Sequence, residues 1–233
     1  MADQRGRAAS EVLRERFREI HGPMLPAIEV SVASQQTPLF PLQAVLFPGG
    51  LLRLRVFEAR YLDLMADCLR ERQAFGVVAL RSGAEAGKSR SKVEFETIGT
   101  LAELIDVDSE QPNILQVRCR GTQRFSLSSP TRRDDGLWLA ETTLWPDDEV
   151  LAPSPALIDT VRGLASAIAA LKNSNAPPFL EPYRFDDAAW VGNRWCEILP
   201  IPQAAKQKLM ELTDPMLRLQ LVDDFLRSKG VVK

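Results

Sequence analysis

The sequence has little histidine and little cysteine, and both shortages limit the chemistry that it can support. His21 is the single histidine, and it stands beside a Gly-Pro pair where we expect a helix to end. Catalytic triads, Cys-His pairs and multi-histidine metal sites need imidazole, so they are disfavoured. Cys68, Cys119 and Cys196 lie far apart, without the spacing of a zinc site. We expect each to be a small buried hydrophobe, and we expect no cofactor.

Excess charge and long apolar runs are also missing. Lys and Arg number 29 against 31 Asp and Glu, for a formal charge of −2, so no global basic field attracts nucleic acid or an anionic membrane. No run approaches the roughly 18 apolar residues that span a bilayer. The first 23 residues are charged and lack the apolar core of a signal peptide. These features predict a cytoplasmic protein without a membrane partner, for which nucleic acid is a disfavoured ligand.

One stretch imitates a phosphate-binding loop. "SGAEAGKS", Ser82 to Ser89, ends as a P-loop does, but three residues separate Gly83 from Gly87 where that loop has four. A polar stretch and a strand pattern follow it instead of a helix, so no helix dipole is aimed at a phosphate. We therefore predict a flexible hairpin loop.

Adjacent acidic residues recur along the chain and could serve acid–base chemistry or a hard cation. Three of the four pairs lie in turn-like surroundings and the fourth lies in a helical pattern. Neighbouring side chains on a helix point to different faces, so no pair converges. We predict surface turns and helix caps at these clusters, which are Asp134-Asp135, Asp147-Asp148-Glu149, Asp186-Asp187 and Asp223-Asp224.

The hydrophobic pattern divides the chain into three parts. Residues 1–36 contain a short amphipathic helix, Ser10 to Ile20, followed by a linker. Residues 37–150 alternate apolar and polar side chains in short runs, which predicts antiparallel strands interrupted by one helix from about residue 58 to 72. Residues 151–233 change to a period near 3.6 and predict a bundle of four helices, the last opened by Asp214 as N-cap and Pro215. The fold class is therefore α+β.

The stretch "TPLFPLQAVLFPGGLLRLRVFEARYLDLM", residues 37–65, contains three prolines that forbid a long regular strand. Gly49-Gly50 permits a turn that returns the chain as "LLRLRVF", which passes directly into the helix. We expect this arrangement to bring the first strands together and to place the helix across an open end of a small barrel.

This stretch resembles the opening of the N-terminal, substrate-binding domain of the Lon protease family. The likeness continues in order through Phe75-Gly76-Val77, Ile98-Gly99-Thr100, "GTQRF" at residues 121–125 and "LPIPQAAKQKLMELTDPMLRLQLVDDFL" at residues 199–226. It implies an N-terminal PUA-like antiparallel pseudo-barrel lobe followed by a C-terminal α-helical bundle, together spanning residues 37–227. Full Lon proteases continue into an ATPase module and a Ser-Lys protease domain. This chain ends at Lys233 and resembles instead the stand-alone Lon-domain proteins of bacteria.

The resemblance implies a binding role, and our leading hypothesis is a non-enzymatic module that recognises exposed or unfolded polypeptide segments. A Lon-type ATPase or protease is an expected partner, and a homo-oligomer is compatible with the sequence. Leu46, Phe47 and Pro48 beside the glycine pair form the candidate contact patch if they are exposed to solvent. The competing interpretation of Phe47 is a buried core residue.

Three further hypotheses remain open. PUA-like folds often meet RNA, and four arginines are expected on solvated strand faces near the loop at residues 88–92: Arg53, Arg55, Arg118 and Arg120. An enzyme using lysine or carboxylates would need a pocket with convergent ionisable groups, and the sequence shows none. A scaffold or assembly module is the third alternative, because fold alone says little about function.

Overall fold

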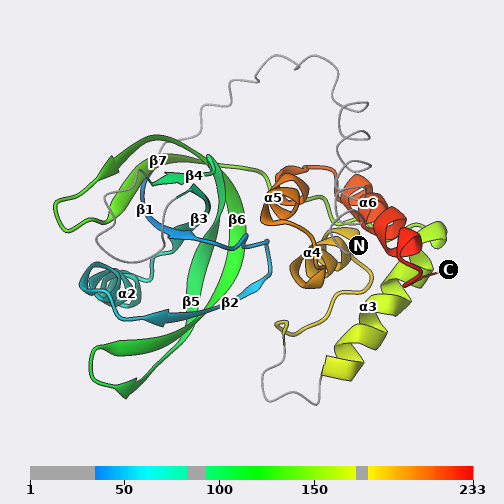
Figure 1. Ribbon diagram of the computed structural model, residues 1–233, viewed down its shortest axis with the longest axis horizontal. Coiled ribbons are helices and arrows are strands. Elements are labelled where there is room, and N and C mark those ends of the chain that lie inside the picture. Colours follow the sequence, from blue (N-terminus) through cyan, green and yellow to red (C-terminus); the bar gives the residue numbers. More distant parts are fainter. Residues whose placement is uncertain (1–34, 83–92, 172–177, 233) are drawn as a thin grey trace, which may run out of the picture.

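Two lobes lie side by side in the computed structural model, a β-rich lobe at the left of Figure 1 and a helical lobe at the right. The structure describes residues 35–82, 93–171 and 178–232. The predicted helix from Ser10 to Ile20 and most of the loop from Ser82 to Ser89 lie outside these ranges. Among the described residues, none of the helices has the length and apolar character needed to cross a membrane.

The β lobe is a sheet that closes on itself. Its strands are β1 (Gln35–Leu42), β2 (Leu51–Val56), β3 (Phe75–Ser82), β4 (Glu94–Phe95), β5 (Ile98–Gln111), β6 (Ile114–Arg132) and β7 (Trp138–Leu144). They follow the order β1-β7-β6-β5-β3-β4, and β1 also pairs with β3. That pairing closes a ring, which removes the open edges of the five strands in it. The antiparallel pseudo-barrel is confirmed, except that β1 and β3 run parallel.

Strand β2 stands apart from this ring. It pairs antiparallel with the first half of the long strand β6, from Leu51 opposite Arg120 to Val56 opposite Leu115. Helix α2 (Ala59–Glu71) follows β2 and closes one end of the β lobe (Figure 1). The ring of Tyr61 on this helix stacks on Phe40 of β1, with ring centroids 3.9 Å apart. The predicted helix and its position across the barrel end are confirmed.

The helical lobe has one largely buried helix, named α4 below, with the other helices packed around it. It consists of the short 3-10 turn η1 (Pro155–Leu157) and helices α3 (Ile158–Leu171), α4 (Ala188–Ile198), α5 (Gln203–Glu211) and α6 (Pro215–Ser228). The Asp214 side chain accepts hydrogen bonds from two backbone N–H groups at the start of α6, as the sequence predicts. Asp187 does the same for α4, although its side chain is also buried.

Buried charges join the two lobes. The Asp148 carboxylate lies between the guanidinium groups of Arg124 on β6 and Arg218 on α6, with Arg218 Nη1 at 2.7 Å from its Oδ2. Arg124 and Arg218 also donate to the carbonyl oxygen of Leu212, and Arg124 donates to that of Met210. These side chains are at most 7% exposed. The predicted surface position of Asp148 is therefore wrong, because two arginines compensate its burial.

The predicted surface position of Asp223, in another of the acidic pairs, is also wrong. It is 2% exposed on the inner face of α6, where it accepts a hydrogen bond of 2.5 Å from the Thr160 hydroxyl of α3. Arg227 contacts its other oxygen at 2.7 Å. The carboxylate thus ties α6 to α3 and is not a surface residue.

We predict that Asp148→Asn lowers the free energy of unfolding by about 3 kcal/mol, because it leaves two buried guanidinium charges without a counter-charge. Chemical denaturation monitored by tryptophan fluorescence measures the change. The neighbouring exposed residue provides the control, and Asp147→Asn should change stability by less than about 0.5 kcal/mol. Equal effects of the two substitutions would contradict the proposed importance of the buried ion pair.

Candidate functional site: the groove along β2

The predicted contact patch is buried. Phe47 is 0% exposed and Leu46 is 7% exposed. Phe47 belongs to the core of the helical lobe although it comes from the β lobe. Pro48 is partly buried, and its carbonyl oxygen accepts a hydrogen bond of 2.9 Å from Arg194. Exposure to solvent, on which the contact patch depended, is absent at Phe47, and the competing interpretation of Phe47 as a core residue is correct. Leu46 borders the hollow described below.

A tight turn at residues 47–50 sends Phe47 into the helical lobe. The Gly50 N–H donates to the Phe47 carbonyl oxygen at 2.9 Å, with Pro48 and Gly49 between them. Gly49 has a φ of +74°, which a type II turn with proline at its second position requires. The Gly49 N–H donates to the carbonyl oxygen of Gly121, and the Gly121 N–H donates to that of Gly50. Two residues of the turn thus lie opposite one residue of β6, which is a β-bulge.

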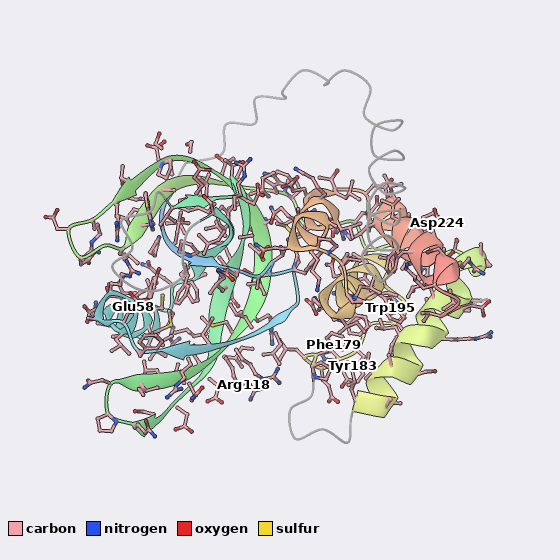
Figure 2. All side chains as sticks on the ribbon, viewed as in Figure 1. Glu58, Arg118, Phe179, Tyr183, Trp195 and Asp224 are labelled. Atoms are coloured by element: carbon pink, nitrogen blue, oxygen red, sulfur yellow. The ribbon has the colours of Figure 1, made fainter. Side chains whose placement is uncertain are left out.

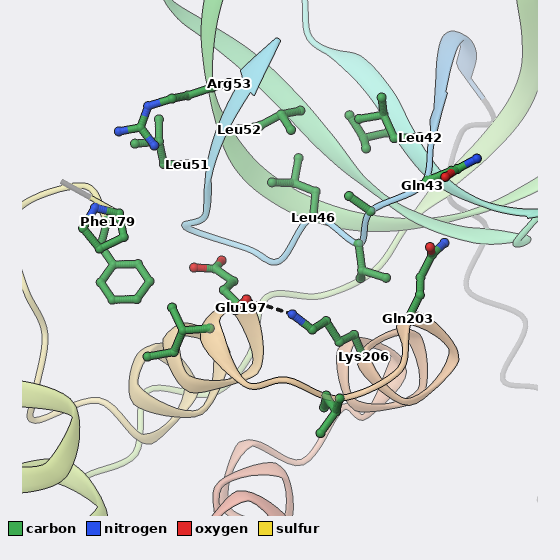
Figure 3. Close-up of a pocket in the computed structure, with 16 residues that line it drawn as sticks. Leu42, Gln43, Leu46, Leu51, Leu52, Arg53, Phe179, Glu197, Gln203 and Lys206 are labelled. Carbon is green, nitrogen blue, oxygen red and sulfur yellow. Dashed lines mark hydrogen bonds between the residues drawn. The ribbon is translucent and has the colours of Figure 1, made fainter. Parts of the chain in front are cut away.

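A hollow of about 500 Å³ lies where this turn brings the lobes together. Its β-lobe wall comes from residues 42–46 and 51–53, and its other wall comes from Phe179 and from the end of α4 to the start of α5. Figure 3 shows Leu46 and Leu52 facing this hollow from one side, with Glu197 and Lys206 on the other. Most of the lining side chains are aliphatic or aromatic.

A second hollow, of about 310 Å³, continues the first. The two share Leu42, Ala44, Leu52 and Arg53. The second runs on past residues 54–58, between β2, the end of β1 and the start of α2. We call the two hollows together the β2 groove. No residue pattern in the sequence indicated this groove, because its walls are far apart along the chain.

In the first hollow, Glu197 interacts with two basic side chains. Its carboxylate accepts a hydrogen bond of 2.6 Å from Arg194, and the Lys206 ammonium donates to its backbone carbonyl oxygen at 2.8 Å (Figure 3). Burial raises the pKa of Glu197 to about 7, against the opposing effect of the Arg194 and Lys206 charges. Burial also lowers the pKa of Lys206. One titrating carboxyl group therefore faces the groove near neutral pH.

The four arginines of the RNA hypothesis gather on the exposed outer face of β2 and β6, where Figure 2 labels Arg118. Arg53 lies directly opposite Arg118 in the strand register. On the other side of β6, Glu103 and Asp106 of β5 are in register with Arg120 and Arg118. This acidic row counts against a uniformly basic surface, and part of the expected basic loop lies outside the described residues.

The described residues show neither an activated thiol nor a cluster of metal ligands. Burial raises the pKa values of the three thiols to about 11 for Cys68 and about 12 for Cys119 and Cys196, so they are not nucleophilic near neutral pH. Within the same residues, there is no group of three or more histidine, cysteine or acidic side chains that could hold a metal ion. An apolar groove with a few polar groups is typical of ligand recognition.

Residues 36–228 match the family model of the ATP-dependent protease La (LON) substrate-binding domain. The chain belongs to the Lon substrate-binding domain family. A crystal structure of a Lon N-terminal domain protein from Xanthomonas campestris is similar to this chain, with 32% sequence identity and a TM-score of 0.65 over 82% of this chain and 98% of that one. The resemblance found in the sequence is therefore confirmed.

Other members of the Lon family agree with this assignment. The N-terminal domain of a Mycobacterium avium complex Lon protease has the same fold at 15% identity and a TM-score of 0.56, over 83% of this chain and 98% of that domain. The Lon protease of Anaeromyxobacter dehalogenans is 30% identical over 91 residues, which are 39% of this chain. Lon protease 2 of Myxococcus xanthus is 30% identical over 92 residues. The aligned residues make up only 11% of each of these two proteases.

We predict that the ionisation of Glu197 makes stability depend on pH. Its pKa of about 7 lies above the ordinary value of 4.5, so between these values the folded protein binds more protons than the unfolded chain. Stability should therefore fall as pH rises from about 4.5 to about 7 and then level off. Glu197→Gln removes this dependence, and the difference in unfolding free energy between wild type and variant should follow that course. A difference that stays constant or grows with pH would contradict the prediction.

Proposed function

We propose that this Lon-family domain is a non-enzymatic binding module that holds exposed apolar segments of polypeptides in the β2 groove. The observation that carries the proposal is the groove itself, an apolar hollow with walls from both lobes. The family model describes a substrate-binding domain, and the substrates of a protease are polypeptides, so the proposal assigns to this chain the ligand class of its family.

The groove has the dimensions of an extended peptide. It follows all six residues of β2, a length of roughly 20 Å at the rise of a strand. Leu51, Leu52 and Ile201 line the groove and are partly exposed, so they offer apolar contacts to a bound segment. An unfolded or partly unfolded chain exposes short apolar runs of this size, whereas a folded protein buries them. Selectivity for unfolded polypeptides follows from that difference.

The proposal assigns no ATPase or protease activity to this chain. The family model that matches it is that of the substrate-binding domain, and the described residues that line the groove include two carboxylates, Glu58 and Glu197, and one ammonium group, Lys206. A separate Lon-type ATPase or protease is the partner to which bound polypeptides would be delivered. We propose the cytoplasm as the compartment in which this occurs.

A titration with a permanently unfolded polypeptide, followed by backbone amide shifts in NMR spectra, tests the proposal. We expect shifts confined to the β2 groove, and we expect none with the same polypeptide in its folded form. Shifts spread evenly over the surface, or equal responses to the two forms, would sink the proposal.

Matched variants locate the interaction. Ile201→Ser replaces a partly buried groove residue, and Val150→Ser replaces an apolar residue that is 68% exposed outside the groove. We expect Ile201→Ser to weaken binding of the unfolded polypeptide roughly fivefold to tenfold, because it removes apolar contact area. Val150→Ser should leave binding unchanged. An amide spectrum that keeps the native dispersion shows that each variant remains folded.

A further inference from the structure

We infer that the open edge of β2 is the docking edge, where a partner polypeptide adds as an extra strand whose acidic side chains alternate with apolar ones. This inference deepens the proposed function and rests on it. The proposed function requires only apolar contact in the groove, whereas strand addition also requires backbone hydrogen bonds and a definite register.

The groove lies along the edge of β2. This strand pairs with β6, and within the described part of the chain it pairs with no other strand. Side chains of a strand alternate between two faces, so a hollow over one face would contact every second residue. Every residue from Leu51 to Phe57 lines one of the two hollows. Both faces therefore border the same space, which places the groove at the edge that β6 leaves open.

The hydrogen bonds at the turn show which backbone groups of β2 point toward β6. The Gly121 N–H donates to the Gly50 carbonyl oxygen at 2.9 Å, so Gly50 directs its carbonyl toward β6. In an antiparallel pair, the backbone groups of successive residues point alternately toward the partner strand and away from it. Leu52 and Leu54 therefore face β6, whereas the alternate residues of β2, Leu51, Arg53 and Arg55, direct their N–H and C=O groups away from β6. Added at this edge, a strand would bond to alternate residues of β2.

The side chains of β2 define what the added strand carries. Leu54 and Val56 turn inward and are at most 9% exposed, so an added strand would meet apolar surface on that face. Arg53 and Arg55 occupy the exposed outer face. Opposite charges on neighbouring strands stabilise a sheet, whereas like charges directly opposite each other destabilise it. The favoured partner strand thus places glutamate or aspartate outward and leucine or valine inward.

The same charges argue against a second copy of this chain at the edge. Two β2 strands paired across a dimer would bring Arg53 and Arg55 of one copy against the same residues of the other. Asp106 lies 3.7 Å from the Arg118 guanidinium group on the far side of β2, and the dimer would supply no such acidic residue between the arginines of the two β2 strands. Charged residues on an open strand are also a common protection against self-association. An acidic partner relieves the repulsion that a second copy would increase.

Backbone N-methylation of a probe peptide gives the direct test. The probe is a seven-residue peptide in which leucine or valine alternates with glutamate, prepared in two forms with methyl groups on the amides of alternate residues. If the peptide adds as a strand, one form loses its hydrogen bonds to β2 and should bind roughly tenfold more weakly, while the other binds as the unmodified peptide does. Equal affinities of the two forms would overturn strand addition.

Charge reversal tests the outward register. Arg55→Glu should weaken binding of the glutamate peptide roughly fivefold and strengthen binding of a peptide with lysine in place of glutamate. Arg162→Glu, at an exposed arginine of α3 outside the groove, is the matched control and should change neither affinity. Identical effects of the two substitutions would show that only net charge matters and would overturn the specific register.

The outcomes separate this inference from the proposed function. One outcome is that unfolded polypeptide shifts the groove amides while the two N-methylated forms of the probe bind with equal affinity. That result would support apolar capture in the groove and overturn strand addition. If neither the probe nor unfolded polypeptide binds, both fall. If sedimentation velocity shows a dimer that the probe peptide dissociates, the edge serves self-association and the assignment to an acidic partner is wrong.

Discussion

The buried carboxylate of Asp148 holds the molecule in its present form, because it is the negative charge shared by an arginine from each lobe. Removing two guanidinium groups from water is unfavourable unless a counter-charge and further acceptors surround them. Asp148 and the carbonyl oxygens at the end of α5 provide those acceptors only when β6 and α6 are correctly placed. The relative position of the lobes, and with it the width of the β2 groove, therefore depends on this contact. A groove of fixed width suits a ligand of constant thickness, such as an extended backbone.

Much of the fold could be predicted from the sequence, because the determinants are local. Alternating apolar residues indicated the strands, and Asp214 followed by Pro215 marked the start of α6. The turn at residues 47–50 could also be predicted, because a proline followed by two glycines strongly favours a turn conformation. The ordered motifs of the Lon family then supplied the arrangement of these elements.

The site could not be predicted in the same way. Leu46 and Phe47 are adjacent to a turn, and turns are usually exposed, but Phe47 packs into the core of the helical lobe and Leu46 into that of the β lobe. Asp148 was assigned to the surface because its sequence neighbours are polar, whereas its arginine partners stand 24 and 70 residues away. Local sequence carries no information about such partners. The groove likewise depends on residues far apart in the sequence, because its walls combine residues near 45 with residues near 200.

The insertion of Phe47 into the core of the helical lobe has a kinetic consequence. The Phe47 ring would have to leave that core before the lobes moved apart. We therefore expect no opening and closing of the groove by a hinge motion of the lobes. Under the proposed function, a bound segment would enter and leave sideways, along the edge of β2 opposite β6, with no large domain movement. Exchange should therefore be fast and reversible for short segments and slower for longer ones, because release requires successive contacts to be broken. Such length dependence would let the domain sample many chains briefly and retain those with the longest exposed stretches.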